Sequence, residues 1–207
     1  SPSIHIVNQV HGNKVIKASE AIKTPWPKAD GIISTGIKEQ SLWICTADCI
    51  PIFFSNKETG QVAAAHAGWK GVSRKILEKV IFKLRISESN RKNWLVTLGP
   101  SISLKKYQIK ADVAFKIYES IKSKSAKDEK LNDRINNMES LGIIKNDREE
   151  KRFYLDIKSA AAHQLIKQGF NNSQININQN CTFSESELFH SWRREKAKAI
   201  QWSCILS

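Results

Sequence analysis

Short apolar segments bounded by turn residues recur along the chain and predict β-strands. They are rich in Val, Ile and aromatic side chains, which fit the pleated, half-buried surface of a sheet. The segments lie at residues 42–54, 61–67, 93–99, 174–178 and 199–206. The hydrophobic pattern therefore predicts a core built on β-sheet.

Three further segments place apolar residues at helical spacing, and we expect a helix in each. The first stripe consists of Val72, Ile76, Leu77, Val80, Ile81 and Leu84, with Ser73 near its start as a candidate cap. The second consists of Ile157, Ala160, Ala161, Leu165 and Ile166. The third begins near Ala111 and carries Val113, Phe115, Ile117 and Ile121 before the chain becomes strongly polar.

The order of these elements favours an α+β fold of mixed α/β layers, in which helices flank a mixed β-sheet core. Strands and helices mix without strict alternation, which argues against a doubly wound parallel sheet. No internal repeat and no Gly/Ser or Pro linker divides the chain, so residues 1–207 are expected to form a single domain. Residues 122–152 have few apolar positions and predict either a helix with exposed faces or an excursion from the core.

The composition is typical of a globular chain with one substantial core, since 41% of its 207 residues are hydrophobic. The longest nearly apolar stretch, residues 42–54, contains Thr46, Asp48 and Pro51 and is shorter than the roughly 20 residues that span a bilayer. Four cysteines are too few for a secreted disulfide scaffold. The N-terminus shows no initiator Met and no secretory leader. We therefore expect a cytoplasmic protein without a membrane span, and a missing N-terminal segment.

The chain is strongly basic, with 33 Lys and Arg against 20 Asp and Glu and a formal charge of +13. This charge suits either a nucleic acid or a small anionic substrate. The basic residues are mostly scattered lysines, without the aromatic interleaving that stacks single-stranded bases. The distribution therefore disfavours a nucleic-acid partner, and most of these side chains are expected on solvated faces.

Three short motifs place a potential metal ligand beside a tight turn. They are QVHG with His11, TADC with Cys49, and HAGWKG with His66. Catalytic zinc commonly takes three protein ligands and leaves a fourth position open, and two imidazoles and a thiol match that number. Each residue also has a purely structural interpretation, because isolated histidines and buried free cysteines are common. The long spacing between the motifs does not decide between the two.

The surroundings of these ligands add further candidates. His66 precedes a glycine turn that opens onto a helix, where backbone N–H groups and Lys70 favour an anion. The alternative is a simple strand-to-helix turn with Trp69 in the core. Asp48 adjoins an apolar strand, where it would act as general base, orient an imidazole or merely cap a turn.

Paired arginines stand near the end of the chain. Arg193 and Arg194 have the shape for bidentate contacts with phosphate or carboxylate, although such pairs are often ordinary surface residues.

Six motifs together resemble one family. They are QVHG, TADC followed by PI, HAGWKG, GPSI at residues 99–102, Cys181-Thr182 and SWRR. The chain is identified by these motifs as a member of the YfiH-type laccase-domain family, once called polyphenol oxidases and now regarded as purine nucleoside phosphorylases. The resemblance covers about residues 11–202. It implies that His11, Cys49 and His66 bind zinc, with copper as the alternative metal, and that the fold is the YfiH-like one.

The resemblance also implies the substrates. They are adenosine, inosine or guanosine, and methylthioadenosine, which are cleaved by phosphate, together with deamination of adenosine. Lys70, Arg193 and Arg194 are then expected to hold inorganic phosphate, while Cys49, His66 and Asp48 carry the chemistry, with Asp48 as the base in deamination.

Three features depart from the family pattern. Lys70 stands where an Arg is usual, so the anion contact there is expected to be weaker. A leader of several tens of residues, with an Arg and a Gly-Gly turn, is absent before QVHG. Lys106-Tyr107-Gln108 replaces a common Cys-Tyr-Glu sequence, so any role of that Cys or Glu is lost.

Other classes of function remain open on the sequence. A cysteine hydrolase would use Cys49 as nucleophile and His66 or His11 as base. A copper-dependent polyphenol oxidase is less favoured, because the chain has five histidines and a single methionine, Met138. A nucleic-acid binder without enzyme activity would use the positive charge directly, and its affinity would fall steeply with salt.

Overall fold

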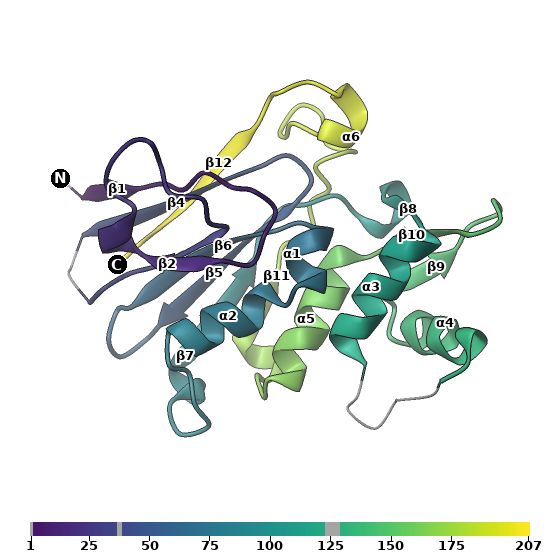
Figure 1. Ribbon diagram of the computed structural model, residues 1–207, viewed down its shortest axis with the longest axis horizontal. Helices are drawn as coiled ribbons and strands as arrows, with labels where there is room; N and C mark the ends of the chain where they lie inside the picture. Colours follow the sequence, from purple (N-terminus) through teal and green to yellow (C-terminus); the bar gives the residue numbers. More distant parts are fainter. Residues whose placement is uncertain (1, 37–38, 123–128) are drawn as a thin grey trace.

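The computed structural model describes residues 2–36, 39–122 and 129–207, and its largest element is a six-stranded sheet (Figure 1). In spatial order its strands are β11 (Ile175–Ile177), β7 (Trp94–Leu98), β5 (Ile50–Asn56), β6 (Val62–Ala67), β3 (Gly31–Ile33) and β2 (Val15–Lys17). The outer pairs β11/β7 and β3/β2 are parallel, whereas the three inner pairs are antiparallel. The expected mixed sheet is thus confirmed.

Two smaller sheets accompany the large one. The first has the order β1 (Ser3–His5), β4 (Gln40–Thr46) and β12 (Gln201–Leu206). The second consists of β8 (Gln108–Lys110), β10 (Arg152–Leu155) and β9 (Ile144–Asn146). In Figure 1 the β1-β4-β12 sheet lies on the opposite side of the large sheet from the helices.

The helices gather on one face of the six-stranded sheet (Figure 1). They are α1 (Trp69–Ser73), α2 (Ile76–Lys83), α3 (Ala111–Ile121), α4 (Leu131–Ser140) and α5 (Ile157–Lys167), and a short α6 (Trp192–Glu195) precedes β12. Among the described residues two buried hydrophobic clusters result, one between the six-stranded sheet and the helices and one between the six-stranded sheet and the β1-β4-β12 sheet. The protein is therefore layered as β-sheet, β-sheet and helices, which confirms the mixed α/β layers expected from the sequence.

Strand β6 lies between these two clusters, and its side chains point alternately into one and the other. Ala63, Ala65 and Ala67 pack into the helical cluster, whereas Val62 and Ala64 belong to the cluster between the sheets. Because successive side chains point to opposite faces of a strand, His66 shares the face of Val62 and Ala64. The register of this strand thus directs the imidazole away from the helices.

Most of the predicted strands are confirmed, but residues 42–54 form two strands rather than one. Strand β4 ends at Thr46 and β5 begins at Ile50, and the two belong to different sheets. The chain turns between them at Asp48, whose φ of 88° is incompatible with a continuing strand. Hydrophobicity alone does not reveal this turn, because apolar residues continue on both sides of it.

The first predicted helix is also divided. Lys75 adopts φ 59° between α1 and α2, which interrupts the helical stripe. Ser73 does not cap a helix, because it lies inside α1 and its hydroxyl donates to the Lys70 carbonyl, 3.0 Å away. The helices expected from Ala111 and Ile157 are confirmed as α3 and α5.

The polar stretch 122–152 contains α4, β9 and the start of β10, and residues 123–128 lie outside the described part. Met138 of α4 is fully buried and anchors the segment to the helical cluster. Across the described residues, no helix combines the length and apolar character needed to cross a membrane.

Candidate metal centre

The three ligands predicted from the sequence come together at one end of β5 and β6. His11 lies in the loop before β2, Cys49 directly precedes β5, and His66 is the fifth residue of β6. Their potential ligand atoms all lie within 4.8 Å of one another. The two imidazole rings meet edge to face, with 4.7 Å between their centroids.

Strand register brings Cys49 and His66 to the same place. Pro51 pairs with His66 and Ile50 with Ala67 in the antiparallel β5/β6 ladder. One step further along, Cys49 faces Gly68, beside the imidazole of His66. Sequence spacing does not reveal this proximity, because it depends on which residues of the two strands are paired.

Asp30 is the residue of this site that the sequence analysis missed. It is fully buried, and one carboxylate oxygen bonds Nδ1 of His66 at 2.9 Å. The same carboxylate accepts backbone N–H bonds from Val10, His11 and Gly12, at 3.3, 2.9 and 2.7 Å. Asp30 therefore fixes both the His11 loop and the His66 ring.

The imidazole-orienting role suggested for Asp48 is thus filled by Asp30 at His66. A carboxylate on Nδ1–H leaves Nε2 for a metal and strengthens the histidine as a ligand. The signal in the sequence was the same for both residues, because Asp30 also adjoins a buried apolar strand, β3.

Cys49 and His66 favour each other's charged forms. Burial opposes both charges, but hydrogen bonds from His11 and His66 lower the pKa of the Cys49 thiol to about 7. Against the same burial effect, Asp30 and Cys49 raise the pKa of His66 to about 9. Cys49 is therefore substantially ionised near neutral pH, and the thiolate is the form that binds metals and attacks electrophiles.

This donor set fits a zinc ion. Zinc bonds imidazole nitrogen and thiolate sulfur at about 2.0–2.3 Å in a tetrahedron, so neighbouring donor atoms stand ~3.5 Å apart. The observed ligand atoms lie within 4.8 Å of one another, which is close to that spacing. Three protein ligands leave a fourth position for a substrate, as catalytic zinc sites do.

Gly68 provides the space that the cluster occupies. A Cβ at this position would lie 2.6 Å from Sγ of Cys49 and 3.3 Å from Cδ2 of His11. The first distance is shorter than real Cβ contacts, so any side chain at residue 68 forces the sulfur to move.

We expect Gly68→Ala to lower zinc affinity by roughly 10–100-fold, the range seen when a residue supporting the ligands is lost. Gly71→Ala is the matched control, because a Cβ there meets its nearest atom at 3.4 Å. Competition with a chromophoric chelator measures both affinities. Wild-type affinity in Gly68→Ala would contradict the packing argument.

Asp48 lies beside the cluster, but both of its carboxylate oxygens accept hydrogen bonds from the C-terminal segment. One carboxylate oxygen accepts the Thr182 hydroxyl and the other the backbone N–H of Arg193, each at 2.7 Å. Its backbone carbonyl accepts the N–H of Ile102 at 3.0 Å. Asp48 therefore joins the β4–β5 turn to two distant segments and brings Arg193 close to Cys49.

The two adjacent arginines have different surroundings. The Arg194 guanidinium donates to the carbonyls of Thr182, Phe183 and Phe189 and to Glu195. Arg193 donates from Nη1 to the Gln108 carbonyl at 2.9 Å and stacks 5.2 Å above the Tyr107 ring. Arg194 thus holds the chain turn before β12, whereas Arg193 borders a pocket.

Lys70 lies in α1, with its ammonium 5.8 Å from the ring of Trp69. Lys116 stands at 5.6 Å from the same ring. Both lysines line a pocket together with Arg74 and Glu119. Three cationic side chains against one carboxylate leave the surroundings of Lys70 positively charged.

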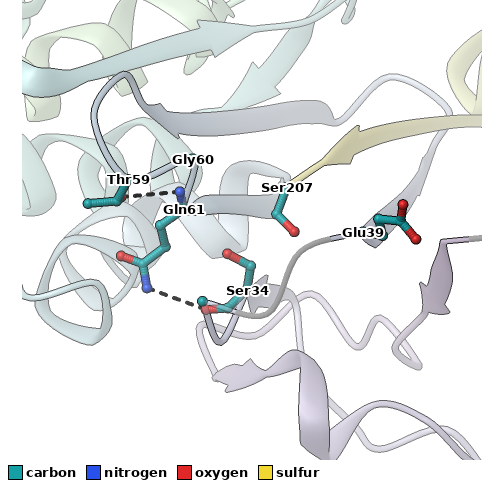
Figure 2. A pocket seen from close by; sticks show the side chains of 7 residues that line it. Ser34, Glu39, Thr59, Gly60, Gln61 and Ser207 are labelled. Atoms are coloured by element: carbon teal, nitrogen blue, oxygen red, sulfur yellow. Dashed lines mark hydrogen bonds between the residues drawn. The ribbon is translucent and has the colours of Figure 1, made fainter.

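A different kind of pocket lies at the far end of β6 (Figure 2). Gln61 precedes that strand, whereas His66 is near its other end. The Gln61 N–H donates to the Thr59 hydroxyl and its side-chain amide to the Ser34 carbonyl. Among the described residues that line it, Glu39 is the side chain that carries a formal charge. This pocket therefore does not suit an anionic substrate.

Comparison with known proteins supports the resemblance seen in the sequence. The family described as "Multi-copper polyphenol oxidoreductase laccase" matches residues 1–206. A Synechocystis protein named purine nucleoside phosphorylase is 36% identical, over 97% of this chain and 78% of its own length. Purine nucleoside phosphorylase YfiH of Escherichia coli is 29% identical, over 96% and 72%. The crystal structure of YlmD from Geobacillus stearothermophilus matches with a TM-score of 0.82 at 25% identity, covering 99% of this chain and 73% of that one.

Proposed function

We propose that this chain, which belongs to the multi-copper polyphenol oxidoreductase laccase family, is a zinc-dependent purine nucleoside phosphorylase. The observation that carries the proposal is the His11–Cys49–His66 cluster, whose ligand atoms lie within 4.8 Å of one another beside pockets lined by cations. The names of the Synechocystis and E. coli relatives support the same activity. The proposed substrates are adenosine, inosine or guanosine, and methylthioadenosine.

In this reaction an oxygen of inorganic phosphate forms a bond to the anomeric carbon of the ribose while the bond to the purine breaks. Positive charge develops on the sugar, so a well-placed anion stabilises the transition state. Among the cationic side chains near the cluster, Arg193 holds the phosphate and lowers its mobility, while Lys70 adds positive charge nearby. A zinc ion held by His11, Cys49 and His66 would supply Lewis-acid chemistry at this site. Asp30 keeps the ligating imidazole in a fixed orientation.

We propose zinc rather than copper. A blue-copper site of two histidines and a cysteine also uses a weak axial methionine, and Met138 is buried in the helical cluster as part of α4. Of the five histidines, His11 and His66 are in the cluster. The chain therefore lacks the histidines that several copper ions would need.

Deamination of adenosine is the second activity proposed for this site. Water attacks C6 of the purine and ammonia leaves, and the reaction needs a base to accept the proton of that water. Asp48 is the proposed base because it adjoins Cys49. Its carboxylate would have to exchange one of its bonds, to Thr182 or to the Arg193 N–H, in order to act.

The decisive experiment incubates zinc-loaded protein with adenosine, with and without inorganic phosphate, and identifies the products by chromatography. Adenine and ribose 1-phosphate, formed only with phosphate, support phosphorolysis. Inosine formed under either condition supports deamination. If a folded, metal-loaded sample forms neither product, the proposed function is refuted.

A cysteine hydrolase is the second candidate, and one observation favours it. Cys49, His66 and Asp30 are connected in the order nucleophile, base and orienting carboxylate, and the pKa of the thiol is lowered to about 7. Stoichiometric zinc that is lost in Cys49→Ser supports the metalloenzyme. A metal-free active protein that iodoacetamide inactivates at Cys49 supports the hydrolase.

A further inference from the structure

We propose that inorganic phosphate binds in a basic pocket formed by Arg152, Arg193 and Lys196 beside the His–Cys–His cluster. This inference rests on the proposed phosphorolysis and assigns its phosphate subsite. Arg152 and Lys196 are not among the residues that the sequence motifs singled out. The subsite is built from two segments far apart in the chain, strand β10 and the end of α6.

The pocket is shaped and charged for a small anion. It holds about 400 Å³, and four cationic side chains line it: Lys110, Arg152, Arg193 and Lys196. Glu149 faces this group, 3.7 Å from Nε of Arg152. The Gln108 amide, which also lines the pocket, donates to Asp147 and to Glu149. Four cations against two carboxylates leave the pocket positively charged, which favours phosphate.

Three observations place this pocket next to the metal ligands. Trp69 lines it and follows Gly68, which packs against the sulfur of Cys49. Tyr107 also lines it, and burial, together with the nearby charges of Cys49 and Asp48, raises the pKa of its phenol. Asp48 binds the backbone N–H of Arg193. A phosphate in the pocket is therefore near a substrate at the cluster.

Arg193 is prepared to bind an anion there, whereas Arg194 is not. Among the described residues, the Arg193 guanidinium makes one hydrogen bond, to the Gln108 carbonyl, and its stacking on Tyr107 fixes its plane. A guanidinium has five N–H donors, so the others are available to phosphate oxygens. In Arg194 three carbonyls and Glu195 take the donors of both outer nitrogens. The fixed plane reduces the entropy lost on binding.

Lys70 and Lys116 contribute to the surrounding field rather than to this subsite. Both line one pocket with Trp69, whereas Arg152, Arg193 and Lys196 line a second one. Trp69 lines both pockets and so borders each basic group. Phosphate is expected to contact the group that adjoins Asp48 and Tyr107.

Steady-state kinetics with varied phosphate test the subsite in Arg152→Gln and in the double variant Arg152→Gln/Lys196→Gln. We expect the KM for phosphate to rise roughly tenfold in the single variant and further in the double one, because charge-assisted bonds are lost. The KM for the nucleoside should change less than about twofold. Lys198→Gln is the matched control, since Lys198 is exposed in the same C-terminal segment and outside the pocket.

Calorimetric titration with inorganic phosphate separates this inference from the proposed function. If the wild-type protein phosphorolyses nucleosides but Arg152→Gln and the double variant keep the phosphate KM of Lys198→Gln, the subsite is wrong and the function stands. If no phosphorolysis occurs, saturable phosphate binding that both variants lose still supports the subsite. If phosphorolysis is absent and the wild-type protein also fails to bind phosphate, the proposed subsite is overturned.

Discussion

Replacement of Cys49 by serine is expected to lower zinc affinity by more than about 100-fold and to abolish phosphorolysis. Loss of a residue that merely supports a metal ligand costs roughly 10–100-fold, and here a ligand itself is removed. A serine hydroxyl remains protonated near neutral pH, whereas the thiol has a pKa of about 7. Metal content after dialysis, measured by mass spectrometry, gives the result independently of activity.

Cys204→Ser is the control for this prediction. Cys204 is exposed on β12, in the β1-β4-β12 sheet, and lies outside the His–Cys–His cluster. The same chemical change there should leave one zinc per chain. Retention of stoichiometric zinc by Cys49→Ser would show that the thiol is not a ligand.

Replacement of Asp30 by asparagine is expected to have the largest effect on stability. Asp30 is fully buried, and its carboxylate accepts bonds from His66 and from three backbone N–H groups. An amide replaces one acceptor oxygen by a donor that faces other donors. Breaking such a buried charged pair costs about 3 kcal/mol or more, which corresponds to a fall of roughly 6–12 °C in Tm for a chain of this size.

The same variant should also weaken zinc binding by roughly 10–100-fold, because His66 loses its orienting carboxylate. Asp112→Asn provides the comparison, since Asp112 is exposed and its salt bridge with Lys116 contributes little. Differential scanning calorimetry and chelator competition measure the two effects. An unchanged Tm and zinc affinity in Asp30→Asn would mean that this carboxylate does not organise the site.

The elements of the fold were readable from local patterns wherever the pattern was long. The stripes beginning at Ala111 and Ile157 became α3 and α5 as expected. The short strands β2 and β3 are not predicted by the hydrophobic pattern, because each contains only three residues and shows no periodicity by itself. The same pattern does not predict the turn at Asp48, since it carries no information about a positive φ.

Only part of the candidate site could be predicted from the sequence. His11, Cys49 and His66 were found because metal-ligand side chains stood beside glycine turns or a proline. Asp30 was missed because its role depends on its contact with His66. That contact follows from the pairing of Gly31 with Ala65 in the β3/β6 ladder. One step along this ladder, the N–H of His66 donates to the Asp30 carbonyl at 2.7 Å.

The sequence by itself determined which residues have the chemistry for a metal centre and which segments form the main strands and helices, because both depend on side-chain type and local spacing. Only the tertiary structure decided which of these residues act together. Strand register placed Cys49 opposite Gly68 and Asp30 beside His66. The bonds of the C-terminal segment left Arg193 open to a pocket and enclosed Arg194. Such choices depend on contacts between residues distant in sequence, and these form only when the chain packs.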